Sequence, residues 1–299
     1  MEKVLKGKKV LIAGAPKTAT TALYFRVKDS LSNNHQGFFE PKDLESCEVA
    51  LQSNVDVVAK IVLIQEFSET TQKILSQFNK NLLIIRDPRD TLISSLLYEG
   101  GYHSAWKKSV DEIADLINIL KQKEEDPSSI SVVKLWDLIA KDSLPIAEFV
   151  RRLNLTITFL QQFPDSFVVR YEDFVQNQNI ENLEKYLELS LNKKSVIPSN
   201  LKRVIRTKSS GNWQAWFTAE DIDYFDSIFS DYMEAFQYKN ISNTIIEDRI
   251  DPKYCSEYFT RLVNEKRKLS GMEPIAAKPT TTPKPLSFIT QLFSKLKLN

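Results

Sequence analysis

The residues that first suggest chemistry lie at positions 14–21, which read GAPKTATT. A short loop of small residues between an apolar strand and a helix directs backbone N–H groups, and the positive end of the helix dipole, at one anion. Lys17 adds a positive charge, and the hydroxyls of Thr18, Thr20 and Thr21 can donate further hydrogen bonds. This segment is therefore expected to bind phosphate, although an ordinary strand-to-helix turn with a threonine cap is the alternative.

The same segment departs from the nucleotide P-loop, GxxxxGK[ST], in two ways. Ala19 and Thr20 stand where the P-loop has Gly-Lys, and the lysine lies three residues earlier, at Lys17. This departure disfavours a conventional ATPase or kinase. A kinase-like phosphotransferase would need magnesium and an acidic residue at a strand end, for which Asp87 and Asp90 are the nearby candidates.

Two further segments combine cations with hydroxyl groups. Arg86 follows an apolar run, and Ser94 lies eight residues later, so the pair could form a second phosphate clamp. Residues 191–211 carry six cations and no acid, and residues 206–213 read RTKSSGNW, which suits a loop that closes over phosphate. A structural ion pair in the Arg-Asp-Pro turn and a solvated basic surface are the alternatives.

The elements that must position these residues follow from hydrophobic spacing. Apolar runs predict buried strands at residues 10–13, 55–64, 82–85 and 167–169. Helical spacing predicts helices at residues 20–31, 70–78, 91–98, 110–123, 146–162, 183–189 and 219–236. This alternation predicts a P-loop-like, doubly wound α/β fold, in which helices flank a mostly parallel sheet. Ligands of such sheets bind at the carboxyl ends of the strands, so the first loop and Arg86 are expected to share one crevice.

Composition limits the classes of partner and location. The 299 residues are 42% hydrophobic and 26% charged, as in an ordinary globular protein. Forty basic and 39 acidic residues give a net charge of +1, so no global charge favours nucleic acid. Two cysteines and two histidines support neither a zinc site nor a disulfide scaffold. With no apolar stretch long enough for a signal peptide or a membrane span, a cytoplasmic location is expected.

The chain is predicted to contain one main domain, residues 1–277, followed by a tail. Residues 278–286 form a linker rich in proline and threonine. Residues 287–298 are predicted to form an amphipathic helix, whose apolar positions are Phe288, Ile289, Leu292, Phe293 and Leu296. This basic helix could fold back on its own domain, dock on a partner or rest on an anionic membrane surface.

Four segments in this order resemble the sulfotransferase superfamily that uses 3′-phosphoadenosine 5′-phosphosulfate (PAPS). Residues 16–21, PKTATT, are similar to the PKxGTT loop that binds the 5′-phosphosulfate. Arg86 and Ser94 match the 3′-phosphate motif, and Tyr171 begins a YED segment whose tyrosine approaches the adenine. Residues 206–213 resemble the RKGxxGDW loop that closes over the nucleotide.

The departures from the family pattern favour one branch. Ala19 replaces the loop glycine, and Ala22 replaces a tryptophan common in the cytosolic steroid and phenol branch. Thr207-Lys208 replaces Lys-Gly, and Val62 stands where that branch has the histidine of KTH. The chain therefore looks closer to the bacterial and carbohydrate-type branch, whose members often place a glutamate where this chain has Glu40.

The resemblance implies an enzyme that moves a sulfuryl group from PAPS, its co-substrate, to a hydroxyl or an amine, without a metal. Lys17 would neutralise the leaving oxygen, Glu40 would take the acceptor proton and Lys60 would lie near the sulfuryl oxygens. The acceptor would be a small molecule, a sugar or a lipid. His103 is a reserve base, and a nucleotide-binding protein without turnover is the alternative that Ala19 and Val62 support. The residues expected to bind PAPS are Lys17, Thr18, Ala19, Thr20, Thr21, Arg86, Ser94, Tyr171, Arg206, Thr207 and Lys208.

Overall fold

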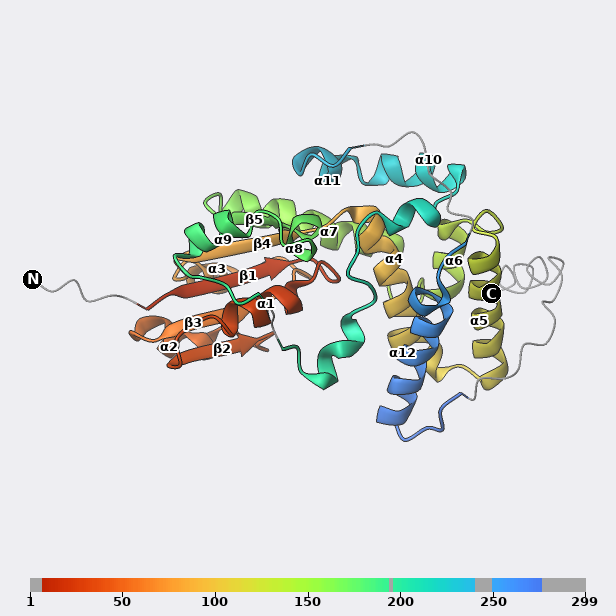
Figure 1. The fold of residues 1–299 in the computed structure, drawn as a ribbon, viewed down its shortest axis with the longest axis horizontal. Helices are drawn as coiled ribbons and strands as arrows, with labels where there is room; N and C mark the ends of the chain where they lie inside the picture. The colour runs from red at the N-terminus through yellow and green to blue at the C-terminus, as the bar shows by residue number, and fades with distance from the viewer. Residues whose placement is uncertain (1–6, 194–195, 240–248, 276–299) are drawn as a thin grey trace, which may run out of the picture.

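The computed structural model describes residues 7–193, 196–239 and 249–275. The described residues contain one sheet of five parallel strands, in the order β2-β3-β1-β4-β5 (Figure 1). The strands are β1 Lys9–Gly14, β2 His35–Phe39, β3 Asp56–Lys60, β4 Lys80–Ile85 and β5 Phe167–Arg170. Helices flank the sheet, so the predicted α/β fold with a parallel sheet is confirmed.

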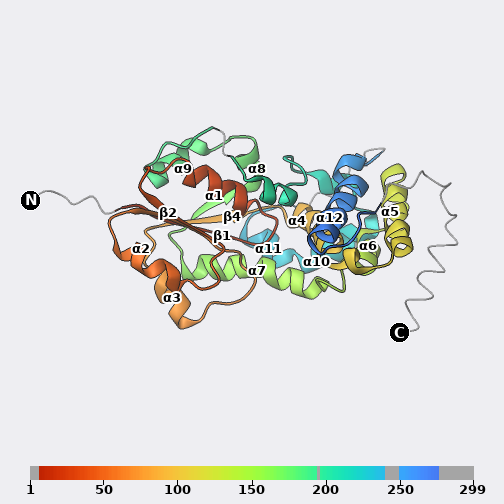
Figure 2. The ribbon, with the colours of Figure 1, turned by 90° about the horizontal axis from the view of Figure 1, so that it is seen from below.

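Helices cover both faces of the sheet (Figure 2). One face carries α1 Thr20–Lys28, α8 Tyr171–Val175 and α9 Ile180–Leu187; the other carries α2 Glu48–Gln52, α3 Glu69–Leu75 and α7 Ile146–Gln162. Successive strand residues point to opposite faces, so Val10 and Ile12 join one hydrophobic cluster while Leu11 and Ala13 join the other. Both faces are therefore buried, which explains why β1 reads as a continuous apolar run.

A helical layer lies beyond the carboxyl ends of the strands (Figure 1). It contains α4 Pro88–Tyr98, α5 Val110–Glu125, α6 Val132–Ile139 and α12 Ser256–Leu269, and a π-helical turn, Glu99–Ser104, extends α4. Shorter 3₁₀ turns are Glu45–Cys47, Ala105–Lys107, Ser199–Val204, Asn212–Ala215 and Pro252–Tyr254. This layer faces the carboxyl ends of the strands.

The structure adds helices α2, α6, α8 and α12, which were not predicted, and differs from the predicted elements elsewhere. β2 was not predicted, the strand predicted at residues 55–64 already ends at Lys60, and the helix predicted at residues 219–236 is divided. Its two parts are α10 Ala219–Ile228 and α11 Ser230–Ala235. The division falls at Phe229, whose ψ of 1° departs from helical values while its ring stays buried on Phe225.

The predicted linker, residues 278–286, and the predicted terminal helix, residues 287–298, lie outside the described residues. The last described segment is held to α12, because Asn264 donates a hydrogen bond to the Ile275 carbonyl and accepts one from its N–H. None of the helices in the described ranges is long and apolar enough to cross a membrane.

Candidate functional site

The site lies at the carboxyl end of β1, where the order of the strands reverses direction. From β1 the chain passes to β2 and β3 on one side, whereas β4 and β5 lie on the other side. Gly14, the last residue of β1, pairs with Ile84 of β4, so the loop after β1 lies beside Arg86 at the end of β4. Arg86 Nη1 donates a hydrogen bond to the Lys17 carbonyl at 3.1 Å. The predicted shared crevice is therefore present.

The loop after β1 adopts a strained, compact path. Lys17 and Ala19 have left-handed φ angles of 68° and 72°, a conformation that costs most residues about 1–2 kcal/mol. A Cβ on Gly14 would lie 2.7 Å from the Ile84 carbonyl oxygen, so glycine is required there. The Thr18 hydroxyl donates to the Ala15 carbonyl at 2.8 Å and thereby closes the loop.

A cavity of about 660 Å³ opens between this loop, α4 and the segment of residues 193–208. Its walls include every predicted site residue except Thr18, whose side chain is fully buried inside the loop. Predicted residues that line it are Lys17, Ala19, Thr20, Thr21, Glu40, Lys60, Arg86, Ser94, Tyr171, Arg206, Thr207 and Lys208. Segments more than 180 residues apart in sequence thus meet in one cavity, which suits a ligand with several separate groups.

Two buried arginines give the cavity a strongly cationic wall. Arg86 and Arg206 are 4% and 7% exposed, and the Nε and Nη2 atoms of each have no hydrogen-bond partner within the described residues. Burial, and secondly the positive charge of Arg86, lowers the pKa of Arg206 to about 10. Keeping two cations together in a buried site is costly unless an anion binds between them. Their free N–H groups therefore indicate a phosphate site.

Lys17 lines the cavity beside Tyr98. Its Nζ donates to the Val204 carbonyl at 3.0 Å and lies 3.8 Å from the centroid of the Tyr98 ring. Burial holds the pKa of Lys17 well below its usual range; the carboxylate of Glu99 opposes this effect, and the charge of Arg86 adds to it. This ammonium group is poorly solvated, so its interaction with a bound anion is strengthened.

Lys60 and Glu40 form an ion pair beside the loop. They are neighbours because β2 pairs with β3 so that Phe39 lies opposite Lys60, and the Glu40 N–H donates to the Lys60 carbonyl at 2.9 Å. Lys60 is 2% exposed, whereas the Glu40 side chain is 48% exposed. Lys60 Nζ also donates to the Thr21 hydroxyl at 3.2 Å. Burial lowers the pKa of Lys60, and the Glu40 carboxylate partly offsets that effect.

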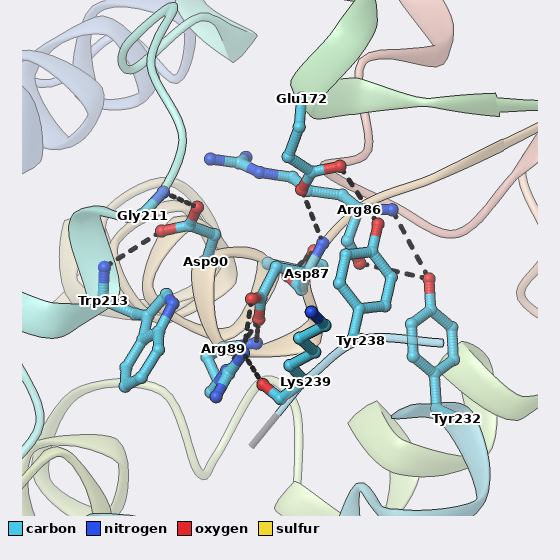
Figure 3. Close-up of polar contacts among 11 residues, drawn as sticks. Arg86, Asp87, Arg89, Asp90, Glu172, Gly211, Trp213, Tyr232, Tyr238 and Lys239 are labelled. Atoms are coloured by element: carbon cyan, nitrogen blue, oxygen red, sulfur yellow. Dashed lines mark hydrogen bonds and ion pairs between the residues drawn. The ribbon is translucent and has the colours of Figure 1, made fainter. Parts of the chain in front are cut away.

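In the segment after β4, some charged residues stabilise the fold and others line the cavity (Figure 3). Asp87 caps α4 and accepts hydrogen bonds from Arg89 Nε and Nη2 at 2.9 and 2.7 Å. The Arg89 guanidinium lies 3.9 Å from the centroid of a Trp213 ring, and the Asp87 N–H donates to Glu172. The ion pair of this turn is thus formed by Asp87 with Arg89, not with Arg86 as the alternative interpretation of the Arg-Asp-Pro turn had it, and Arg86 lines the cavity.

Asp90 holds residues 206–213, here called the basic loop, in place, a function that the sequence did not reveal. Its fully buried carboxylate accepts the N–H groups of Gly211 at 2.7 Å and Trp213 at 3.0 Å (Figure 3). Burial raises the pKa of Asp90, while the charge of Arg86 opposes that shift. An acid four residues after Arg86, within a helix whose residues are otherwise mostly apolar or small, was the available signal.

Tyr171 connects the end of β5 to the same loop. Its hydroxyl donates to the Thr207 carbonyl at 3.2 Å, and the Arg86 guanidinium carbon lies 4.1 Å from its ring centroid. Tyr171 therefore helps to position both Arg86 and the loop.

The reserve base, His103, lies outside the cavity wall. It belongs to the π-helical turn, with its ring centroid 5.2 Å from that of Tyr102 and 5.5 Å from that of Tyr98. Partial burial and the charge of Lys266 lower its pKa. Of the two proposed bases, Glu40 is the one that lines the cavity.

Comparisons with known proteins agree with this geometry. A family model described as a sulfotransferase domain matches residues 7–202. A crystal structure of mouse sulfotransferase SULT7A1 complexed with PAP is 15% identical, with a TM-score of 0.51, and the match covers 78% of this chain and 89% of that chain. That likeness concerns the fold alone, and a comparison with curated proteins found no match. Because the family model covers well over half of the residues, the chain belongs to the sulfotransferase family.

Proposed function

We propose that this sulfotransferase moves a sulfuryl group from PAPS to a hydroxyl group, or less favourably an amine, of an acceptor. The observation that carries the proposal is the pair of buried arginines, Arg86 and Arg206, whose free N–H groups line the same cavity as the loop after β1. One phosphate would bind at the loop and a second between the arginines. A nucleotide with phosphates on both its 3′ and 5′ positions suits that arrangement.

The chain's own residues would then perform an in-line transfer. Glu40 takes the proton of the acceptor oxygen as that oxygen bonds to sulfur, and the bond from sulfur to the 5′-phosphate oxygen breaks. Lys17 stabilises the negative charge that develops on the departing phosphate oxygen. Lys60 holds Glu40 through their ion pair and directs its ammonium group towards Thr21. Positioning and charge stabilisation dominate such a transfer, as they do for phosphoryl groups.

The contacts of Asp87 and Asp90 weaken the kinase-like alternative. Their carboxylates, the candidates for holding magnesium, accept hydrogen bonds from Arg89 and from the backbone of residues 211 and 213. The alternative without turnover is weakened because Glu40 and Lys60 both line the cavity beside the loop.

We further propose a carbohydrate-type acceptor chemistry, with Glu40 rather than a histidine as the base. The acceptor would be a sugar, a lipid or another small molecule with a hydroxyl group, and nucleic acid is not an expected partner. A cytoplasmic location remains our expectation, and docking of residues 287–298 on a partner or a membrane surface remains a proposal.

Thermal unfolding tests the nucleotide specificity. In EDTA, 3′-phosphoadenosine 5′-phosphate (PAP) should raise the Tm, because a ligand at 100 times its Kd stabilises the native state by about 2.7 kcal/mol. ATP with magnesium should not. Arg86→Ala should abolish the preference for PAP over adenosine 5′-phosphate, because it removes the charged contact to the 3′-phosphate. If ATP with magnesium stabilises the protein and PAP does not, the proposal is wrong.

Transfer itself requires an acceptor assay. Sugars, lipids and phenols would be incubated with the protein and PAPS carrying radiolabelled sulfur, and labelled products separated. A labelled product that disappears in Glu40→Gln supports the assignment. If PAP binds but none of these classes is labelled, the alternative of binding without turnover is favoured.

A further inference from the structure

The cavity wall continues along α1 beyond the loop after β1. Ala22 and Arg26 lie one turn apart on the same face of this helix, and both line the cavity. Phe174, Val175 and Ile197 complete an apolar wall. Beside these apolar residues, Arg26 and Lys193 supply positive charge and Asn177 supplies a side-chain amide.

Arg26 is unusual among helical arginines because it is buried without an acidic ion-pair partner among the residues that the structure describes. It is 6% exposed, and the described residues place no carboxylate within ion-pair distance of its guanidinium. Nη1 donates to the Asn177 side-chain oxygen at 2.8 Å, while the buried Nε has no partner within the described part of the chain. Such a group is normally satisfied, so its free N–H capacity indicates a ligand.

The position of Arg26 fits the base of a nucleotide. It lies five residues beyond Thr21, which is about 8 Å along the helix axis. A nucleotide whose 5′ end reacts beside Lys17 and Glu40 can place its base against the part of the cavity wall formed by Ala22, Arg26 and Phe174. The apolar residues there suit the face of an aromatic ring, and a guanidinium, which only donates hydrogen bonds, suits the acceptor nitrogens of a purine.

We propose that Arg26 determines binding of the purine base, by donating a hydrogen bond to a ring nitrogen, and that Asn177 positions its guanidinium for this contact. This inference rests on the proposed function, since it assumes that a nucleotide occupies the cavity. If Arg26 only held the turn that contains Asn177, replacing it would weaken the binding of all ligands of the cavity to the same extent.

Calorimetry with two ligands separates these cases. PAP carries the base, whereas ribose 3,5-bisphosphate carries the same phosphates without it. Arg26→Met keeps the length and the apolar contacts of the side chain but removes its donors, so PAP should bind at least about tenfold more weakly. Ribose 3,5-bisphosphate should bind Arg26→Met within about twofold of wild type, a difference well below the strength of one hydrogen bond.

Lys28→Met is the matched control. It removes the same charge from the same helix at a residue that does not line the cavity, so both ligands should bind it as they bind wild type. Equal losses for the two ligands in Arg26→Met, or no loss for PAP, would overturn the proposal.

A second variant covers the case in which Arg26→Met fails to fold. Asn177 has a left-handed φ of 55°, which glycine adopts freely. Asn177→Gly therefore keeps the backbone while releasing the guanidinium, and should weaken PAP but not ribose 3,5-bisphosphate. If wild type binds neither ligand, the proposed function itself fails. If it binds both equally well, the phosphate site stands and the base contact is wrong.

Discussion

Lys17 and Glu40 are the residues on which the chemistry depends, and their surroundings differ. Lys17 is enclosed among cations and an aromatic ring, whereas Glu40 is half-exposed and tied to a buried lysine. Burial makes the positive charge of Lys17 easier to lose as pH rises, because desolvation disfavours the charged form. These two environments lead to separate kinetic expectations.

The charge of Lys17 should limit activity at alkaline pH. Its pKa lies well below the usual range of lysine because of burial, so the ammonium group is present at low pH and is lost as pH rises through that pKa. The value of kcat/KM for PAPS, which reports groups of the free enzyme, should therefore fall on the alkaline side. In Lys17→Arg, whose guanidinium stays charged, the fall should move to higher pH. An unchanged alkaline limb would assign it to another group.

Replacing Lys17 by alanine should affect turnover more than binding. The positive charge matters most when negative charge develops on the leaving oxygen, so kcat should drop by about 10²-fold or more. Calorimetry with PAP should show a smaller loss. Near-normal turnover at saturating PAPS would contradict this function of Lys17.

Glu40→Gln should separate proton transfer from nucleotide binding. The amide has nearly the same shape but cannot take a proton, so turnover should fall by about 10²-fold while PAP affinity is unchanged. The Tm should also fall, because Lys60 would lose its carboxylate partner while remaining buried. His103→Ala is the comparison and should retain activity; the opposite pattern would move the base to the π-helical turn.

At the scale of elements, the first turn of α1 combines strain with binding. Ala19 caps this helix in a left-handed conformation, with φ of 72° and ψ of 24°, although its side chain makes no capping hydrogen bond. Strain of this kind is typical of ligand-binding loops. Because of this strain, a substitution at the start of α1 can stabilise the protein.

Ala19→Gly should stabilise the fold. Relief of left-handed strain, about 1–2 kcal/mol, exceeds the entropic cost of glycine, about 0.5–1 kcal/mol. The Tm should rise by about 1–3 °C. Ala22→Gly, three residues into the same helix, is the control and should lower stability by about 1 kcal/mol. A lower Tm for Ala19→Gly would show that the loop relaxes differently from this expectation.

The anchoring of the basic loop to α4 can be tested at Asp90. In Asp90→Asn the side chain keeps one acceptor oxygen, so one of the two loop N–H groups loses its partner and stays buried. Stability should fall by about 1–3 kcal/mol in denaturant unfolding. PAP affinity should fall too, because Arg206 belongs to the same loop. Asp223→Asn, on the exposed side of α10, should stay within about 0.5 kcal/mol of wild type.

The strands that could be predicted from the sequence are those buried on both faces, because their residues form continuous apolar runs. The runs at residues 10–13 and 82–85 were recognisable because both faces of their strands are covered. β2 was not, since its burial is only partial and its five residues contain two apolar side chains. α12 could have been found, because Tyr258, Phe259, Leu262 and Val263 recur at helical spacing and are all buried.

Prediction of the site was limited in a similar way. Lys17 and Arg86 stood in recognisable local patterns, so their shared cavity was expected. Asp90 and Arg26 were missed because their partners, Gly211 and Asn177, are far away in sequence and only the fold brings them near. Local patterns identify groups that act through their own segment, but not groups that act across the chain.

At the scale of the whole molecule, the last described residues of the domain are held by hydrogen bonds to α12. Ile275 is buried and bonded to Asn264, so the segment after α12 is part of the packed structure up to that residue. Truncation after residue 277 keeps these contacts.

The truncated protein should bind PAP as the full chain does. Sedimentation with vesicles of anionic lipid then tests the tail, because a short basic amphipathic helix gains both apolar burial and charge attraction at such a surface. If only the full chain sediments, the membrane option is supported. If neither sediments and truncation lowers solubility, the helix packs on its own domain.

The central place of β1 has a consequence for how the protein is made. β1 is the first of the five strands to leave the ribosome, yet its two neighbours, β3 and β4, are synthesised later. Until both have emerged, at least one edge of this apolar strand stays unpaired in the growing chain, and unpaired apolar strands are prone to aggregate. The nascent chain should therefore depend on chaperones until at least β4 has been translated, and slow translation before residue 80 should lower the yield of folded protein.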